Sequence, residues 1–286
     1  MDLFAVQVLN GLVTGSVYSL VALGLTLIYG TMHVPNFAHG HLYMLGAYVT
    51  FSLVTFAGLH YWTATVAAMI VLAVLGLALE RLVFRPLRHA PPINAMIAAV
   101  GVMLFFEGVA QRIWGEDFRR MSSPYDTVVS IAGLNITAHR LILIGAAAML
   151  MIGLLLFLTR TVAGSALRAT AQDREGALLV GIDTERVTMG TFALSAAIAS
   201  IAGSLITPIS LIYPAMGALV TLKAFAIVVL GGMGSVTGAL AGGYLLALAE
   251  SLGGTYVSAD YQDLVAFMML VVVFAFRPTG LFREAP

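Results

Sequence analysis

Long apolar runs, separated by short polar stretches, limit this chain to few kinds of fold. Residues 4–29 contain no Asp, Glu, Lys or Arg, and a helix needs only about 20 apolar residues to cross a bilayer. Hydrophobic residues make up 60% of the chain and charged residues 10%, compared with about 45–50% and about 25% in soluble domains. We therefore predict an all-α polytopic membrane protein, with a single transmembrane domain that covers residues 1–286.

Glycine and proline divide the apolar sequence into segments of unequal length. We expect roughly eight to ten transmembrane helices or half-helices, with residues 208–223 as an external hairpin or half-helix. The four-residue spacings Gly11–Gly15 and Gly238–Gly242 predict faces for close helix packing. The expected apolar segments are residues 4–29, 42–56, 63–84, 93–114, 141–158, 188–207, 224–230, 236–252 and 264–276.

Residues 164–186, called here the 164–186 segment, form a polar island between two apolar runs. Charged residues each cost about 2.5–3.5 kcal/mol at the bilayer centre, and so this segment cannot span. We expect one short helix, with Ser165 as its N-cap and Gly181 as a left-handed C-cap. The alternating signs of charge favour a protein partner over anionic lipid, and a solvated connecting loop is the alternative. Its charged residues are Arg168, Asp173, Arg174, Glu175, Asp183, Glu185 and Arg186.

The distribution of arginines predicts which side each connection faces. Arg81, Arg85 and Arg88 follow the third apolar run, and the positive-inside rule places them in the cytoplasm. By alternation, residues 115–140 then lie outside, although Arg119 and Arg120 do not favour that side. The C-terminus is expected inside.

Two stretches interrupt the apolar helices with residues that free backbone groups. Lipid cannot satisfy such groups, and so each break must contact protein or line a wet cavity. We hypothesise that residues 30–40 and 231–238 face each other across a translocation path. A local turn, and close helix packing by the glycines, are the alternatives. The candidate path residues are Asn36, His39, Gly40, Gly231, Gly232, Gly234, Ser235 and Glu250.

Three glutamates lie within or at the edge of apolar runs. Ionisable residues at such places are rare and commonly functional. We expect Glu80 to lie at the membrane interface beside Arg81. For Glu107 and Glu250, reaching toward the interface or pairing between helices is the simpler explanation, and the sequence names no partner for either.

The chain offers few groups for catalysis or cofactor binding. It has no cysteine, which excludes zinc–thiolate sites and cysteine nucleophiles. A metal site built from His33, His39 and His41 is not expected, because His39 and His41 are two residues apart and would not share a helix face. No other cofactor is expected. Lys223 is the only lysine, and the residues around it lack the phosphate-binding pattern of an ATPase. A net charge of zero makes nucleic acid an unexpected partner.

Four motifs resemble one family of membrane proteins. Arg168-Ala169-Thr170-Ala171-Gln172-Asp173-Arg174-Glu175-Gly176-Ala177, followed by Gly181-Ile182, is similar to the cytoplasmic coupling loop of the branched-chain amino acid ABC transporter permeases. Asn36-Phe37-Ala38-His39-Gly40, Gly231-Gly232-Met233-Gly234-Ser235 and Phe276-Arg277-Pro278-Thr279-Gly280-Leu281-Phe282 also resemble that family. The resemblance covers nearly the whole chain.

This resemblance implies a permease subunit in the bacterial inner membrane, with no ATPase activity of its own. Its implied partners are two ATP-binding cassette subunits, a second homologous permease and a periplasmic substrate-binding protein. The implied substrate is leucine, isoleucine or valine, with urea and short-chain amides as the alternative within the family. The residues expected to couple to the ATPase are Arg168, Asp173, Arg174, Glu175, Ala177 and Gly181.

Two other classes of function fit the composition less well. An ion-coupled secondary transporter or channel usually carries charged residues at mid-span, and the apolar runs have almost none. An intramembrane hydrolase needs a nucleophile beside a base, and no histidine lies inside an expected span. Dependence of uptake on ATP, as opposed to an ion gradient, separates the first class from a permease of the ABC type.

Overall fold

The computed structural model describes residues 3–88, 90–131, 134–256, 258, 262–276 and 280–281. These residues form eleven α-helices and one short β-hairpin, which confirms the predicted all-α class. Leu79 ends α3, and a π-helical turn (Glu80–Phe84) and a 3-10 turn (Arg85–Leu87) extend it. The elements are α1 (Leu3–Met32), α2 (His39–Thr55), α3 (Tyr61–Leu79), α4 (Pro92–Trp114), β1 (Val128–Ile131), β2 (Leu134–Thr137), α5 (Ala138–Arg160), α6 (Val162–Gln172), α7 (Arg174–Leu179), α8 (Thr184–Ile206), α9 (Met216–Gly231), α10 (Val236–Tyr256) and α11 (Gln262–Phe276).

Six of these helices are long and apolar enough to cross a membrane: α1, α3 with its extension, α4, α5, α8 and α10. Helices α2, α9 and α11 are shorter, with 17, 16 and 15 residues. At about 1.5 Å per residue, a 16-residue helix falls short of a hydrocarbon core about 30 Å thick. The described part of the chain is therefore a multi-pass membrane protein with both full and shorter helices.

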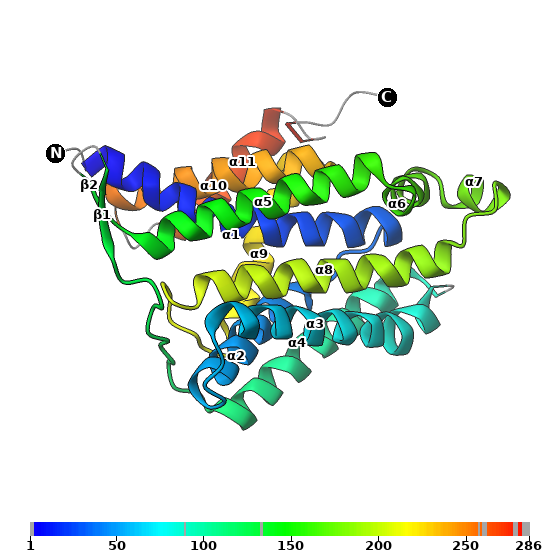
Figure 1. The fold of residues 1–286 in the computed structure, drawn as a ribbon. Helices are drawn as coiled ribbons and strands as arrows, with labels where there is room; N and C mark the ends of the chain where they lie inside the picture. Colours follow the sequence, from blue (N-terminus) through cyan, green and yellow to red (C-terminus); the bar gives the residue numbers. More distant parts are fainter. Residues whose placement is uncertain are drawn as a thin grey trace.

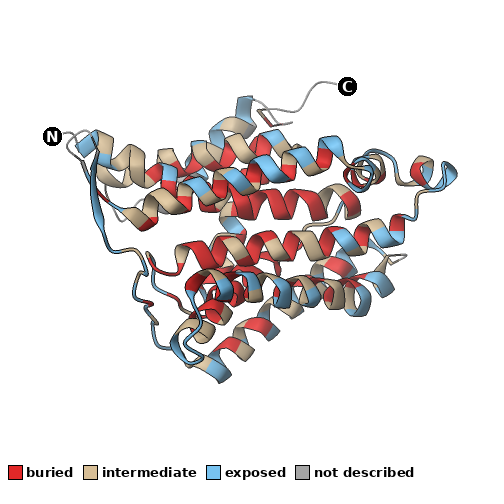
Figure 2. Ribbon diagram, viewed as in Figure 1, coloured by how far each residue is buried: buried red, intermediate tan, exposed pale blue. Residues whose placement is uncertain are grey.

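The long helices lie side by side and give the molecule two ends (Figure 1). The hairpin β1–β2 lies at one end, called the hairpin end, and helices α6 and α7 lie at the other, called the α7 end. Helix α9 runs across the direction of its long neighbours. Buried residues concentrate on α1, α2, α8 and α9, in the interior of the bundle (Figure 2).

Glycines allow α1 and α10 to approach closely. A Cβ atom on Gly11 would lie 2.7 Å from Leu248 Cδ2, and one on Gly15 would lie 2.7 Å from Tyr244 Cδ1. The predicted packing face of α1 is thus confirmed, and its partner is α10. Gly238 and Gly242 of α10 in turn contact Gly231 and Ile227 of α9, which confirms the second predicted face.

The outward faces of α3, α4 and α5 carry large apolar side chains. Gly145 and Gly153 of α5 have open space where a Cβ atom would be. In a soluble protein an apolar surface of this extent would mark an interaction site, whereas on helices of this length it is the surface that meets lipid. Exposed side chains on these helices include Val74, Ile97, Leu104, Phe105, Met149 and Ile152.

The 164–186 segment does not form the predicted single helix. It contains most of α6, all of α7 and the start of α8. Helices α6 and α7 are separate because Asp173 adopts an extended conformation between them (φ −150°, ψ 105°) and its Oδ1 accepts a hydrogen bond from Gly176 N at 3.0 Å. The N-cap of α6 is Thr161, whose Oγ1 accepts from Gly164 N, and the prediction of Ser165 was wrong. Gly181 has φ +86°, so its predicted left-handed conformation is confirmed.

Helix α9 starts earlier than predicted. It begins at Met216, and Lys223 lies in its middle where the sequence indicated the end of an external hairpin. Residues before α9 run along the hairpin end, where Ile212 and Arg119 exchange backbone hydrogen bonds of 2.8 and 2.9 Å. The half-helix alternative for residues 208–223 was therefore correct. The start of the helix had been predicted about two turns too late in the sequence.

Candidate functional site

Two groups of polar residues stand out in this apolar molecule. The first, called the charge-pair cavity, is built around Tyr18 of α1, Lys223 of α9 and Glu250 of α10. The second, called the α7-end cluster, surrounds Arg88 beside the 164–186 segment. Membrane helices bury ionisable side chains only where these are paired or face water, and so both groups are candidate sites.

The charge pair joins three helices that are distant in sequence. Lys223 Nζ lies 3.1 Å from Glu250 Oε1 and 3.1 Å from Oε2, and it donates to Tyr18 Oη at 2.9 Å. Tyr18 Oη donates to Glu250 Oε2 at 3.1 Å. The lysine side chain is 12% exposed and the glutamate 1%. Removing one partner of such a pair would leave a buried charge without compensation, at a cost of about 3–5 kcal/mol.

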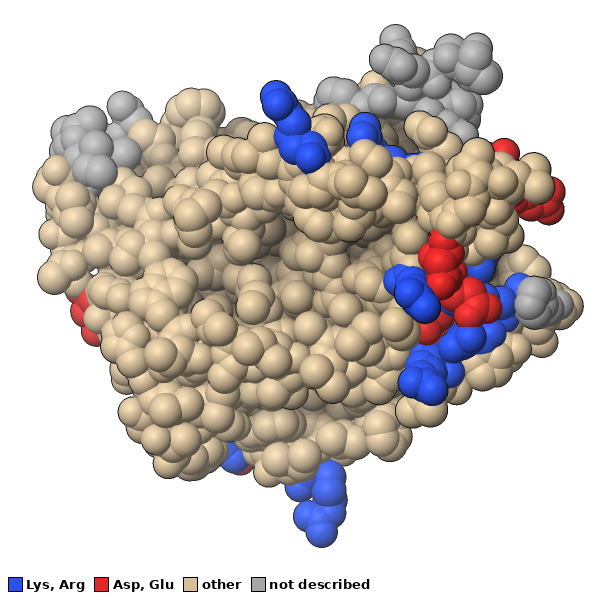
Figure 3. All heavy atoms as spheres, turned by 45° about the vertical axis from the view of Figure 1, so that its right-hand side comes forward, with Lys and Arg blue, Asp and Glu red and all other residues tan. Residues whose placement is uncertain are grey.

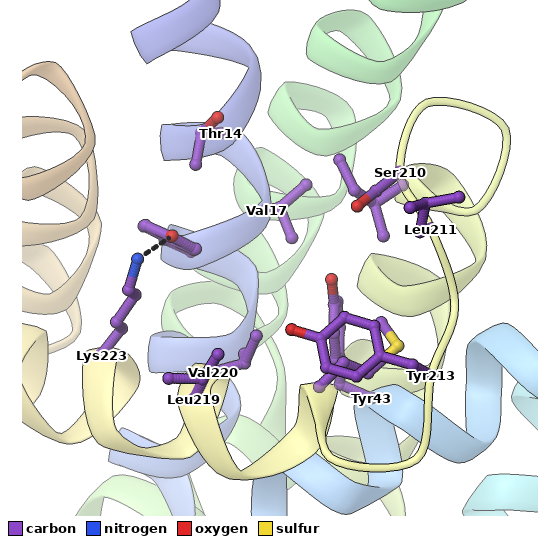
Figure 4. A pocket seen from close by; sticks show the side chains of 12 residues that line it. Thr14, Val17, Tyr43, Ser210, Leu211, Tyr213, Leu219, Val220 and Lys223 are labelled. Atoms are coloured by element: carbon purple, nitrogen blue, oxygen red, sulfur yellow. Dashed lines mark hydrogen bonds between the residues drawn. The ribbon is translucent and has the colours of Figure 1, made fainter. Parts of the chain in front are cut away.

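A cavity of about 240 Å³ opens beside this pair (Figure 4). Lys223, Tyr18, Tyr43 and Tyr213 give it polar atoms, and Tyr43 and Tyr213 lie across from Lys223. Apolar side chains form the rest of the wall. They are Val17, Ile206, Leu211, Met216, Leu219 and Val220.

A second cavity of about 290 Å³ reaches the glutamate of the pair. It is lined by Glu250, Gln7, Asn10 and Ser251, and both cavities include Thr14. Polar side chains therefore follow the α1–α10 groove from the hairpin end to the middle of α1. Polar side chains on this face would be costly in lipid, and so the face is covered by protein or open to water.

The sequence found only part of this site. Glu250 was a candidate path residue, and its alternative interpretation as a member of an inter-helix pair is confirmed. Lys223 was missed as a site residue, although a single lysine inside an apolar stretch is itself a signal. Glu107 also has an inter-helix partner, since its Oε2 lies 3.6 Å from Nε2 of the buried His41.

The first break lies in the interior, between α1, α8 and α9. Asn36 Oδ1 accepts from Ala38 N at 3.1 Å, so the side chain closes a local turn. His39 Nε2 lies 3.0 Å from Val21 O of α1. Gly40 N donates to Thr221 Oγ1 at 3.1 Å, and a Cβ atom on Gly40 would lie 2.2 Å from Gly217 O. These residues therefore fix α2 against α9.

The second break separates α9 from α10. Gly232 and Gly234 have φ of +97° and +89°, conformations that side chains rarely adopt. Ser235 Oγ accepts from Gly238 N at 3.0 Å and so begins α10. Gly231 lies ten residues after Thr221, about 15 Å along α9. The two breaks contact different levels of α9, and that they face each other across a translocation path stays a prediction.

The α7-end cluster binds the extension of α3 to the start of α8. Arg88, 8% exposed, donates to the buried Glu80 and lies 3.7 Å from Glu185 Oε1. Arg85 also donates to Glu185. Glu80 is 1% exposed and pairs with Arg88, and its place at the membrane interface beside Arg81 stays a prediction. Figure 3 shows a group of acidic and basic side chains gathered on one part of a face that elsewhere carries only scattered charges.

The candidate coupling residues fall into three environments. Arg168, Asp173, Glu175 and Gly181 are exposed, and Arg174 is half-buried. Ala177 is buried, so it is a packing residue of α7. Beyond it lies an apolar tip that the sequence analysis missed, formed by Leu178, Leu179 and Val180, of which Leu179 is 88% exposed and Val180 77%.

The comparisons with known proteins agree with the features described above. The family model for branched-chain amino acid transport system permease components matches residues 7–274. The chain is 35% identical to the high-affinity branched-chain amino acid transport system permease protein BraD of Pseudomonas aeruginosa, over 96% of this chain and 94% of BraD. It is 34% identical to LivH of Escherichia coli K12, over 97% and 95%, and 28% identical to LivM of the same organism, over 93% and 67%. The chain therefore belongs to the family of branched-chain amino acid transport system permease components.

Proposed function

We propose that this chain is a membrane-spanning subunit of an ABC importer for branched-chain amino acids in the bacterial inner membrane. Its proposed partners are two ATP-binding cassette subunits, a second homologous permease and a periplasmic substrate-binding protein. The match of the family model to residues 7–274 carries this proposal. LivH and LivM of Escherichia coli bear the same system name, which supports a pair of different, related permeases.

The arginines support an orientation with the α7 end in the cytoplasm. Seven arginines lie at that end of the described chain and four at the hairpin end, and cytoplasmic connections carry the excess of positive charge. The seven are Arg81, Arg85, Arg88, Arg160, Arg168, Arg174 and Arg186, and the four are Arg112, Arg119, Arg120 and Arg140.

The apolar tip of α7 supports docking of an ATP-binding subunit. Leu179 and Val180 lie beyond the membrane-spanning helices and are almost fully exposed. Each large apolar side chain gains about 1.5–3 kcal/mol when it is fully buried. Asp173, Arg174 and Glu175 flank the tip with charge, an arrangement that resembles an interface with an apolar centre and a polar rim. Glu185 follows the tip at the start of α8 and lies 3.7 Å from Arg88, which pairs with Glu80 after α3. Movement of the tip on ATP hydrolysis would reach the bundle through these contacts.

The polar groove between α1 and α10 supports a path beside a second permease. Gln7, Asn10 and Glu250 line the cavity in this groove, and their polar side chains would be costly in contact with lipid. A homologous subunit placed there would shield the groove from lipid and complete a route to the charge-pair cavity. The breaks around Asn36 and Ser235 would then support the helices that form the route.

Uptake of labelled substrates tests this proposal. In cells that lack the chain, we expect loss of high-affinity uptake of leucine, isoleucine and valine, and recovery when the gene is restored. Urea and acetamide uptake should be the same in both strains. Restoration of urea or acetamide uptake without amino-acid uptake would replace the proposal with its alternative in the same family.

A further inference from the structure

We propose that Lys223 and Glu250 together bind the two charged groups of a zwitterionic α-amino acid as it passes through the charge-pair cavity. Lys223 would take the carboxylate and Glu250 the ammonium group. This inference deepens the proposed function and rests on it. It assigns recognition of the amino-acid head group to the permease itself.

The geometry of the pair matches the geometry of the ligand. The amine and the carboxyl group of an α-amino acid are attached to the same carbon, and Lys223 Nζ and the Glu250 carboxylate lie 3.1 Å apart. Lys223 lines the charge-pair cavity and Glu250 lines the second cavity, so the pair lies between the two. A zwitterion that enters can exchange one ion pair for two. Charge-assisted hydrogen bonds of this kind are about twice as strong as neutral ones.

A neutral ligand cannot make the same exchange. If urea or an amide separated Lys223 from Glu250, two buried charges would lose their compensation, which is strongly unfavourable. A ligand with one charge would compensate only one partner. The closed pair is therefore a barrier to small neutral solutes, and it opens without that penalty only for a molecule with both charges.

The Tyr18 hydroxyl can hold either member of the charge pair in place when the two separate. Its hydroxyl accepts from Lys223 Nζ at 2.9 Å and donates to Glu250 Oε2 at 3.1 Å. When a substrate takes the place of one partner, Tyr18 can keep the hydrogen bond to the other. Because Tyr18 lies on α1 and the two charged residues lie on α9 and α10, substrate binding would change contacts on three helices.

The remaining wall suits an apolar side chain. Val17, Met216, Leu219 and Val220 line the cavity beside the pair. Its volume of about 240 Å³ lies just below the range of about 300–1,000 Å³ for drug-sized ligands. An aliphatic amino acid is thus of suitable size, with its head group on the charges and its side chain on this wall.

A neutral double variant tests the role of the pair. Lys223→Gln combined with Glu250→Gln removes both charges and leaves none uncompensated, so the protein should insert and assemble. We expect leucine uptake to fall at least tenfold at equal protein levels. Glu107→Gln, which neutralises a carboxylate in contact with His41 outside the cavity, is the matched control and should keep uptake within twofold. Unchanged leucine uptake by the assembled double variant would overturn the inference.

Direct binding separates this inference from the proposed function. The complex that co-purifies with the chain, in nanodiscs and without the binding protein, is titrated with leucine, 4-methylpentanoate and 3-methylbutylamine, and its thermal stabilisation is measured. We expect leucine to act at concentrations at least tenfold lower than either singly charged analogue. Equal potency of an analogue, or no effect of leucine, would refute the inference even if the cells take up leucine normally. A wild-type strain without amino-acid uptake would instead refute the proposed function.

Discussion

Replacing Gly203 by alanine should destabilise the bundle at the contact between α2 and α8. A Cβ atom on Gly203 would lie 2.0 Å from Tyr43 O and 3.1 Å from Ala47 N. Both contacts are with backbone atoms of α2, so no side-chain rotation can relieve them. Inserting a methyl group into a packed interior costs about 1–3 kcal/mol, and at about 2–4 °C per kcal/mol the melting temperature should fall by about 2–12 °C.

Gly153→Ala is the matched control for this substitution. Gly153 lies within α5, and nothing lies within 4 Å of a Cβ atom built there. Alanine should therefore leave the packing unchanged and favour the helix by about 0.5–1 kcal/mol. Fluorescence-detected size-exclusion chromatography of heated, detergent-solubilised protein gives both melting temperatures. Equal melting temperatures for Gly203→Ala and wild type would refute the close approach of α2 and α8.

Three further substitutions test other parts of the account. Leu179→Asp should abolish uptake and co-purification of the ATPase subunit while the chain still inserts, and normal uptake would refute docking through the apolar tip. Arg88→Gln leaves Glu80 buried without its partner and should lower the unfolding free energy by about 3–5 kcal/mol. Adding Glu80→Gln should restore much of the lost stability. A double variant no more stable than Arg88→Gln would argue against the pair. The chain has no cysteine, so single cysteines can report on access to water. Ser235 is half-buried, and a cysteine there should react with water-soluble thiol reagents, whereas a cysteine in place of the buried Asn36 should react only when a change of bound nucleotide exposes it. If neither cysteine reacts in any nucleotide state, both positions are excluded from a wet path.

The sequence predicted those parts of the fold that depend on local composition. The apolar runs correspond to the long helices, and the spacings Gly11–Gly15 and Gly238–Gly242 mark real packing faces. The glycines of residues 231–235 end α9 as expected, since their conformations are nearly restricted to glycine. The predicted end of the last span at Arg277 and Pro278 lies outside the described residues.

Features that depend on contacts between distant segments could not be predicted in this way. Lys223 and Glu250 meet because α9 crosses α10, and nothing near either residue names the other. Glu80 is next to Arg81 in the sequence, yet it lies in the π-helical turn and pairs with Arg88. The division of the 164–186 segment was foreseeable, because Asp173 is a strong N-cap residue, but the helix-forming residues around it favoured one continuous helix.

Transport by the co-purified complex in proteoliposomes tests the central claim most directly. With the binding protein and labelled leucine on the side of the hairpin end, ATP is supplied on the side of the α7 end and all ion gradients are collapsed. The account predicts leucine accumulation that requires ATP and stops with a non-hydrolysable analogue. Accumulation that follows an ion gradient and ignores ATP would contradict it, and would identify the chain as an ion-coupled secondary transporter.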